Sequence, residues 1–358
     1  MARWHDQCFD CAHMKSFAFI PFLLLPACFG GERATTGECP AGETCSDLTP
    51  RGLQFVGADM TDDLALSGPS PTAIGGTQDV QLQYDPTEGH YVALDLPFTA
   101  DDDGGNGVKI DHVAGSVVTV RGMAVRSNYL RITDATTGEL FDRKQLTGAA
   151  IDSIKLVANT FDIPPADREL AWLAGNVQVG VALYGQVQEG SGPTDERIVD
   201  QSMQLTLAGA TQRAWDLVEM PAAIAGTYAL GVTAGDKPTA HLDIVVVDHL
   251  DSLVVDPANP ATVLPNGVAT VCFDGYASQR FVAGLTWHFL VNGVDKAGLG
   301  NCVGVGSSTA TSGTITVVGN ADGMSATTSV AIATARTDAA PARPARVRPS
   351  PAGDRAAM

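Results

Sequence analysis

Positive charge is scarce in this chain, and that scarcity restricts its partners. Among 358 residues, 22 lysines and arginines stand against 40 aspartates and glutamates, which gives a formal net charge of −18. A body this acidic repels the phosphate backbone of nucleic acids, so we expect no nucleic-acid partner. Charged residues of both signs make up only 17% of the chain and hydrophobic residues 45%. The chain therefore has enough apolar side chains to bury a core in each of two or three domains.

The motifs of familiar enzyme classes are missing as well. The chain has no His-Glu-x-x-His, no Gly-x-Ser-x-Gly, no phosphate-binding loop and no dinucleotide fingerprint. The nearest glycine-rich segment, residues 304–309, lacks the third glycine of that fingerprint and is better interpreted as a turn. Histidines and carboxylates are scattered, with no nucleophile beside a base, so we expect a protein without catalytic activity.

The longest apolar run covers residues 16–27 and follows Met14 and Lys15. This run is too short to cross a bilayer, but its length and basic flank are typical of a secretory signal peptide. It ends in Leu25-Pro26-Ala27-Cys28, which resembles the lipobox of bacterial lipoproteins. The resemblance implies that residues 1–27 are removed and that Cys28 is acylated, palmitate being one such acyl group. We therefore expect an exported protein, anchored by lipid to the cell envelope.

Phe29 follows the acylated cysteine, where an aspartate would favour retention in the inner membrane of enteric bacteria. By that resemblance, we expect the outer membrane as the location. Residues 1–13 precede the signal and contain His5, Cys8, Cys11 and His13, a Cys-x-x-Cys flanked by histidines that could ligate zinc. A zinc site needs a fold around it. The favoured interpretation is therefore that translation begins at Met14 and that residues 1–13 are a start-site extension.

Residues 28–50 are rich in Gly, Thr and Glu and have no helical or strand period, so we expect a flexible tether. With Cys28 assigned to lipid, four cysteines remain downstream of it. They are Cys39, Cys45, Cys272 and Cys302. Four cysteines allow three pairings, and export favours their oxidation. Proximity in sequence favours the pairs 39–45 and 272–302, with free buried thiols as the alternative.

Apolar and polar residues alternate with period two in many short segments between residues 51 and 335. Examples are residues 80–84, 177–183 and 285–291. Turns rich in Gly, Asp and Pro separate these segments, and Asn292-Gly293 is the strongest of the hairpin signals. No segment has a helical period. The pattern predicts an all-β protein built from sandwiches.

A short repeat divides this region. Residues 151–154 (Ile-Asp-Ser-Ile) recur as residues 250–253 (Leu-Asp-Ser-Leu), 99 positions later (250 − 151). A period near one hundred residues fits one immunoglobulin-like sandwich per unit. We therefore expect sandwiches over residues 51–148, 149–248 and 249–335, and it stays open whether the first two are separate.

The last unit resembles a group 2 bacterial immunoglobulin-like domain. The resemblance rests on residues 250–257, 264–267 and 313–317 and on Trp287. The preceding units resemble the same family more loosely, and the order of lipobox, cysteine-containing tether and sandwich array is similar to that of myxobacterial envelope lipoproteins. This implies a structural or adhesive array that binds partner proteins or glycans. Residues 336–358 hold five Arg, two Asp and four Pro, and we expect them to be a disordered basic tail.

Asp101-Asp102-Asp103-Gly104-Gly105-Asn106-Gly107 is the best candidate ligand site. Calcium takes about six to eight oxygen ligands, and Asp101, Asp103 and Asn106 can supply several of them. The segment is not an EF-hand loop, because Gly105 stands at a ligand position and no glutamate closes the pattern. The favoured interpretation is a solvated turn between strands, since acidic glycine turns are common in all-β proteins. We expect no cofactor; calcium at this loop is the alternative, and it would make the protein a calcium- or polysaccharide-binding accessory module without catalysis.

Two further groups of residues have both a functional and a structural interpretation. His241 and Asp243 share one face of a strand, and Asp248 and His249 follow it, but two ligands on one strand do not complete a metal shell. An exposed polar strand face is therefore the favoured interpretation. The tryptophans could form a carbohydrate platform, although core packing is the expectation for Trp287 between Leu285 and Phe289. The other two are Trp172 and Trp215.

Overall fold

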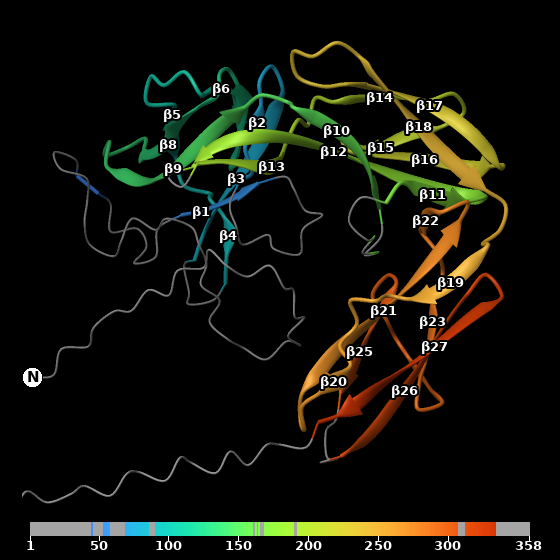
Figure 1. Cartoon of the computed structure of the whole chain (residues 1–358). Helices are drawn as coiled ribbons and strands as arrows, with labels where there is room; N and C mark the ends of the chain where they lie inside the picture. The colour runs from blue at the N-terminus through green and yellow to red at the C-terminus, as the bar shows by residue number, and fades with distance from the viewer. Residues whose placement is uncertain are drawn as a thin grey trace, which may run out of the picture.

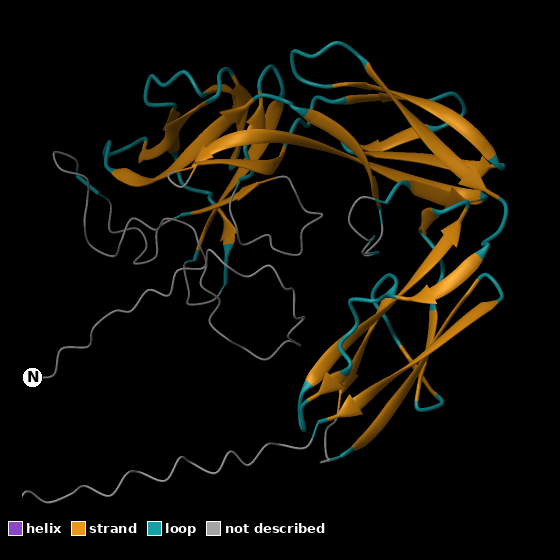
Figure 2. Cartoon of the chain, viewed as in Figure 1, coloured by secondary structure: helices purple, strands orange, loops and turns teal. Residues whose placement is uncertain are grey.

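The computed structural model describes residues 44–45, 53–57, 69–85, 90–159, 162, 164, 168–189, 192–306 and 312–333. Every regular element in this part of the chain is a β-strand, so the predicted all-β class is confirmed (Figure 2). The predicted signal peptide, Cys28, Cys39, almost all of the tether and the basic tail lie outside the described residues. Within the described ranges, no helix is long and apolar enough to cross a membrane.

The first unit consists of β1 (Gln54–Gly57), β2 (Thr72–Ala73), β3 (Thr77–Tyr84), β4 (Val92–Ala93), β5 (Phe98–Asp101), β6 (Val108–Ala114), β7 (Val117–Gly122), β8 (Arg126–Asp134) and β9 (Leu140–Ala149). One sheet has the order β1-β3-β7-β6, with β4 also paired to β3, and the other has the order β2-β9-β8-β5. Alternate residues of β3, β7 and β8 point into a core between the two sheets. This core includes Val80, Leu82, Val118, Leu130 and Ile132.

The second unit consists of β10 (Ser153–Ala158), β11 (Leu170–Leu173), β12 (Gly175–Glu189), β13 (Gly192–Ile198), β14 (Gln204–Thr206), β15 (Thr211–Ala214), β16 (Leu217–Ala223), β17 (Gly226–Thr233) and β18 (Ala240–Val247). One sheet has the order β10-β12-β16-β15, with β13 also paired to β12. The facing strands are ordered β14-β17-β18-β11. Their shared core contains Val179, Leu183, Leu230 and Ile244.

The third unit consists of β19 (Ser252–Val255), β20 (Thr262–Val263), β21 (Val268–Ala277), β22 (Arg280–Ala283), β23 (His288–Val291), β24 (Val294–Lys296), β25 (Cys302–Gly306), β26 (Gly313–Ala321) and β27 (Met324–Ile332). β21 pairs with β19, β22 and β25, and the facing sheet has the order β20-β27-β26-β23-β24. The predicted Asn292-Gly293 hairpin joins β23 to β24, and both turn residues have positive φ. The predicted turn at residues 304–309 is wrong for Gly304–Gly306, which lie in β25.

The same strand order occurs in all three units. With strands lettered along each unit, one sheet reads A-B-E and the other A′-G-F-C, and A′ runs parallel to G in each case. The parallel pairs are β2 with β9, β11 with β18 and β20 with β27. This two-sheet order is that of the immunoglobulin fold. The described chain is therefore a tandem array of immunoglobulin-like sandwiches.

Strand pairing continues from one sandwich to the next. β22 of the third sandwich pairs with β11 of the second, so one eight-stranded sheet runs through both units. A small apolar cluster that includes Ala171, Leu250, Val282 and Leu285 packs at this junction. Figure 1 shows the third sandwich turned away from the line of the first two, so the array is bent. The predicted boundary at residues 248 and 249 stays a prediction, because the sheet continues across it and the core of the second sandwich includes Phe281 and Ala283.

Asp200 ties the first two sandwiches together. Its side chain is fully buried, and Oδ1 accepts hydrogen bonds from the backbone N–H groups of Thr77 (3.2 Å) and Ser202 (2.9 Å). Oδ1 also accepts from the Ser202 hydroxyl (2.5 Å), and Oδ2 accepts a fourth hydrogen bond, from the N–H of Gly235 (2.7 Å). Gly76 packs so close that a Cβ there would lie 2.4 Å from the Asp200 carboxyl carbon. These donors come from both units, so the carboxylate fixes the position of one sandwich against the other.

Candidate functional site

The acidic loop predicted as a ligand site connects β5 to β6 and is fixed to β8 by Asn128. The Asn128 amide donates to the carbonyl of Asp102 (2.7 Å), and its oxygen accepts from the N–H of Val108 (2.8 Å). Gly105 and Gly107 allow this close approach, since a Cβ at Gly105 would lie 2.1 Å from Asn128. The loop is therefore held by a buried side chain twenty or more residues further along the chain, which sequence patterns did not reveal.

The carboxylates of this loop partly serve its own turn. Asp101 Oδ1 accepts from the N–H of Asp103 (2.8 Å), and Asp102 Oδ1 accepts from the N–H of Gly104 (3.1 Å). Asp101 lines a concavity on one side of the loop and Asn106 lines a second concavity, while Asp103 borders both. In the described part of the chain, no group of three or more His, Cys, Asp or Glu side chains is placed to hold a metal. The calcium site therefore stays a prediction.

The sheet beside this loop presents a polar outer face. On β8 and β9, residues directly opposite one another point to the same side, and these outward pairs are Ser127 with Thr147, Tyr129 with Gln145 and Arg131 with Arg143. The Arg143 guanidinium lies 4.5 Å from the centre of the Tyr129 ring. An aromatic ring surrounded by amide, hydroxyl and guanidinium groups is suited to contact polar polymers, including glycans and protein surfaces. We call these residues the β8–β9 face.

Two shallow concavities border the β8–β9 face. One, of about 540 Å³, is lined by Asp101, Asp102, Arg131 and Thr133, among others. The other, of about 370 Å³, includes Asn106, Tyr129 and Gln145. Both are lined mainly by polar groups and lie on either side of the acidic loop. The loop and the β8–β9 face thus form one continuous candidate surface.

The other predicted polar residues are not brought together into a site. His241 and Asp243 are exposed on β18, in agreement with the polar strand face expected for them. His249 Nδ1 lies 2.5 Å from the Asp248 carboxylate and Nε2 lies 3.6 Å from that of Asp251, all on the surface. Exposed pairs of this kind contribute little to stability.

Of the three candidate tryptophans, Trp172 is buried in a core, and Trp215 and Trp287 are half-buried against cores. Trp172 is 2% exposed and packs in the second sandwich. Trp287 stacks on Phe289, with ring centroids 5.8 Å apart, in the third. Trp215 packs against the core of the second sandwich from its edge. Core packing is thus confirmed for Trp287, and Trp172 presents no ring face to a sugar. For the half-buried Trp215 the carbohydrate interpretation stays a prediction.

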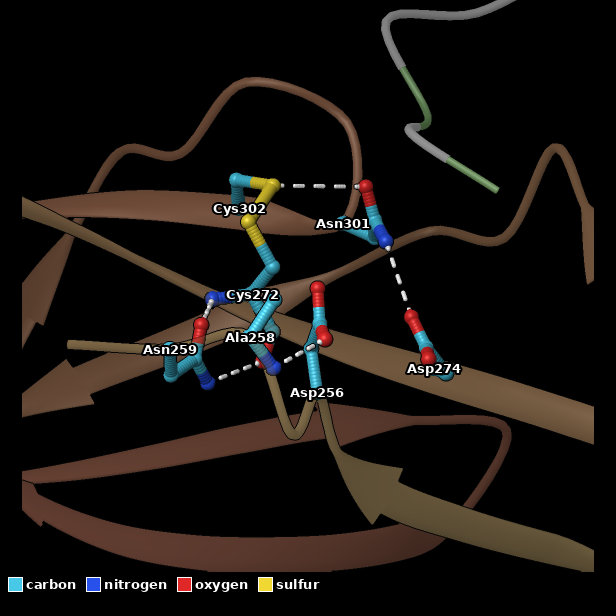
Figure 3. The surroundings of a disulfide bond; sticks show 7 residues. All are labelled: Asp256, Ala258, Asn259, Cys272, Asp274, Asn301 and Cys302. Carbon is cyan, nitrogen blue, oxygen red and sulfur yellow. Dashed lines mark hydrogen bonds between the residues drawn. A yellow bond between two sulfur atoms is a disulfide. The ribbon is translucent and has the colours of Figure 1, made fainter. Parts of the chain in front are cut away.

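Cys272 and Cys302 form the predicted disulfide (Figure 3). The two residues are directly opposite on β21 and β25, with Cα atoms 4.0 Å apart. The bond therefore joins neighbouring strands of one sheet, and it does not cross the sandwich as in antibody domains. Cys45 is also disulfide-bonded. Its predicted partner, Cys39, lies outside the described residues.

Asn259 takes the place of a neighbouring strand beside this disulfide. Its side-chain oxygen accepts from the N–H of Cys272 (2.7 Å), and its amide donates to the Cys272 carbonyl (2.8 Å). Figure 3 shows Asn259 on one side of Cys272 and Asn301 on the other, where Asn301 donates to Asp274 (3.3 Å). The backbone polar groups of Cys272 are thus satisfied although the strand β19 ends before this point.

Two buried carboxyl groups have raised pKa values. Burial raises the pKa of Asp142 to about 6, against hydrogen bonds from the N–H groups of Leu53 and Arg143. Burial and the nearby Asp256 raise the pKa of Asp274 to about 6. Tyr276, hydrogen-bonded to Asp274, has its pKa raised to about 12, first by burial and then by that carboxylate. The stability of the fold therefore depends on pH through the protonation of these groups. Neither carboxyl is placed beside a nucleophile.

Comparisons with known proteins were made with the whole chain. No known protein family matches it, and no curated protein sequence does. Among solved structures, it is similar to the Escherichia coli adhesin FdeC, with 13% identity over 78% of this chain and 96% of that chain and a TM-score of 0.20. Sidekick-1 immunoglobulin domains 1–5 match with 9% identity over 74% of this chain and 57% of that one, and a TM-score of 0.23.

The Bacteroides ovatus protein SGBP-B, from a mixed-linkage glucan utilization locus, matches with 13% identity over 75% of this chain and 67% of that one, and a TM-score of 0.21. Similarity at this level carries no argument about function. The assignment of each unit to the immunoglobulin fold rests instead on its own strand order.

Proposed function

We propose that this protein is a non-catalytic structural or adhesive array, anchored to the cell envelope by lipid on Cys28. The observation that carries the proposal is the continuous joining of the sandwiches. The second and third units share one sheet, and the first and second are connected by the fully buried Asp200. Joints of this kind hold a fixed bend, which is suited to presenting a surface at a set distance from a membrane and not to closing around a substrate.

We further propose the β8–β9 face as the contact surface for an envelope protein or a glycan. This polar sheet face carries the half-buried ring of Tyr129, and it adjoins both concavities. Tyr129 and Gln145 lie opposite each other near its centre. Substituting both with alanine should abolish partner binding and leave thermal unfolding almost unchanged, because neither side chain belongs to the core.

The anchor is tested by intact mass and fractionation of the expressed protein beside a Cys28→Ala variant. A diacyl or triacyl mass increment in the membrane fraction that disappears in the variant supports the anchor. A soluble, unmodified product that retains residues 1–13 contradicts it and returns Cys8 and Cys11 to consideration as a metal site.

The contact surface is tested by a glycan array and by capture of envelope proteins, comparing the wild-type chain with a Tyr129→Ala/Gln145→Ala variant. Ser329→Ala, on the exposed side of β27, is the matched control. Binding that survives the double substitution contradicts the assignment of this face. Binding or stability that appears only with added calcium would favour the alternative, an accessory module for calcium or polysaccharide.

A further inference from the structure

The two junctions inside this chain use the same strand pairing. At the second, A′ strand β11 lies between β18 of its own sandwich and β22 of the next, and it is parallel to both. At the first, A′ strand β2 pairs in parallel with β9, and its Thr72 bridges in parallel to Val199, directly after β13 of the next sandwich. The N–H of Ala73 donates to the Val199 carbonyl (2.9 Å), and the N–H of Val199 donates to the Pro71 carbonyl (2.8 Å).

The strand that enters each junction comes from a hairpin that all three sandwiches possess. After its B strand, each unit has a short strand that folds back on the end of B: β4 on β3, β13 on β12 and β22 on β21. A tyrosine stands at the same register in each, since Tyr84 pairs with Val92, Tyr184 with Arg197 and Tyr276 with Phe281. β4 of the first unit is therefore the counterpart of β13 and β22, the strands that enter the two junctions.

Each end of the array carries one half of such a junction. At the first sandwich, β4 pairs only with β3 among the described strands, and nothing in the described chain lies on its other edge. At the third, A′ strand β20 pairs only with β27 and forms the edge of its sheet in the described residues. The carbonyls of Ala261 and Val263 accept from β27, so the backbone groups of the intervening Thr262 point to the open edge.

Apolar side chains are exposed at both ends. Tyr91, directly before β4, is 36% exposed, and Val92, within β4, is 42% exposed. Leu264, directly after β20, is 66% exposed. The internal junctions cover residues of the same kind, such as Phe281 and Val282, which are at most 1% exposed. An open strand edge with apolar neighbours is a template for pairing with another strand.

We propose that β4 of one copy pairs in parallel with β20 of a second copy, so that chains associate head to tail through a third junction of the kind already present twice within each chain. The partner is a second copy because this chain itself supplies both pairing strands, β4 and β20. Its two internal junctions show that strands of these two kinds pair with each other. β4 and β20 lie at opposite ends of one bent array, so the contact joins two different surfaces. Every dimer therefore keeps one unpaired β4 at one end and one unpaired β20 at the other. Such a heterologous contact forms rings or open chains of copies and not an isolated symmetric dimer. The inference does not depend on the lipid anchor or on the β8–β9 face.

The test uses the full chain in mild detergent and measures mass by sedimentation equilibrium from about 1 to 100 μM, where weak interfaces populate. Val92→Lys places a charge on the β4 edge. Thr262→Pro removes the outward N–H of β20 and leaves the carbonyls of Ala261 and Val263 bonded to β27. Val294→Lys, at an exposed position of the opposite edge strand β24, is the control. All four chains carry the same anchor region, so association through detergent micelles would affect them equally.

The wild type and the Val294→Lys control should rise to about twice the mass of one chain or more with increasing concentration. Val92→Lys and Thr262→Pro should each stay monomeric alone. Mixed one to one, they should form dimers and nothing larger, because the mixture contains one intact β4 and one intact β20 that can meet. Recovery in the mixture also shows that both variants are folded.

A wild-type chain that stays monomeric throughout the range overturns the proposal. So does assembly that either variant alone retains, or a mixture that does not recover dimers while both variants unfold thermally like the wild type. Assembly that a single variant retains would mean that copies meet through a surface elsewhere.

Discussion

Asp152 and Asp251 hold equivalent places in the second and third sandwiches. The N–H of Asp152 donates to the carbonyl of Tyr184 (2.8 Å), and its carboxylate accepts from the N–H of Gln186 (3.1 Å). The N–H of Asp251 donates to the carbonyl of Tyr276 (2.8 Å), and its carboxylate accepts from the N–H of Ser278 (2.6 Å). Each aspartate thus fastens the start of the A strand to the B strand at its tyrosine.

We expect Asp152→Ala and Asp251→Ala each to lower the free energy of unfolding by about 0.5–1 kcal/mol, since each removes one exposed hydrogen bond. Asn at either position keeps an accepting oxygen and should cost less. Chemical denaturation of the four variants measures this. Alanine and asparagine variants of equal stability would show that the shared aspartate has no structural role.

Asp200→Ala should lower the free energy of unfolding by about 1–3 kcal/mol, because it leaves the half-buried N–H groups of Thr77 and Gly235 without their acceptor. It should also uncouple the first sandwich, which would then unfold in a separate, earlier calorimetric transition. Asp243→Ala, exposed on β18, is the control and should change neither stability nor the number of transitions. A single unshifted transition in Asp200→Ala would mean that other contacts alone hold the junction.

Replacing both Cys272 and Cys302 with alanine should destabilise the third sandwich by about 2–4 kcal/mol, the usual effect of losing a disulfide. Trp287 lies in that core and reports on it, so its fluorescence should change at lower denaturant concentration than in the wild type. Reducing agent should shift the wild-type transition in the same direction. The double variant should not respond to reducing agent in this transition.

Stability should rise as the pH falls from 7 to 5. The pKa of Asp142 is about 6 in the fold and near 3.8 when unfolded, so the folded state binds more protons between these values and loses stability as pH increases through them. For Asp142 the change amounts to about 1 kcal/mol. Asp274 acts in the same direction. Denaturation at several pH values measures the slope.

Asp142→Asn should flatten this pH dependence, because the amide does not titrate. Asp134→Asn provides the opposite case. Backbone hydrogen bonds from Thr136 and Thr137 lower the pKa of Asp134, so its contribution is present at neutral pH and lost as pH falls through that lowered value. Removing the Asp134 carboxylate should therefore make the free energy of unfolding rise slightly more steeply as the pH falls. An unchanged slope in Asp142→Asn would show that this carboxyl is ionised in the fold at pH 5.

The calcium prediction is tested by thermal unfolding with and without millimolar calcium. A rise in melting temperature that an Asp101→Asn/Asp103→Asn double substitution abolishes would support a site in the acidic loop. The Asp243→Asn variant controls for general screening of the acidic surface. No rise in the wild type would leave the loop as a turn fixed by Asn128.

Local patterns predicted much of the fold and little of the candidate surface. Period-two alternation identified strands such as β3 and β12, and the Asn292-Gly293 turn was placed correctly. The acidic loop was located but not its attachment to Asn128, because a single polar residue within a strand gives no signal of its own. The equivalent tyrosines escaped notice for a similar reason, since their spacings differ between the units.

The sequence by itself determined the all-β class and favoured the Cys272–Cys302 pair, because each depends on neighbouring or periodic residues. Tertiary structure alone decided which strand edges meet. The pairing of Leu170 with Phe281 and the bond from Thr77 to Asp200 join residues more than one hundred positions apart. Side-chain alternation fixes which face of a strand is buried, whereas backbone edges are chemically alike in every strand. Only the packing of complete sandwiches selects the partner of each edge, and with it the bend of the array and the two edges, of β4 and β20, that no other described strand pairs with.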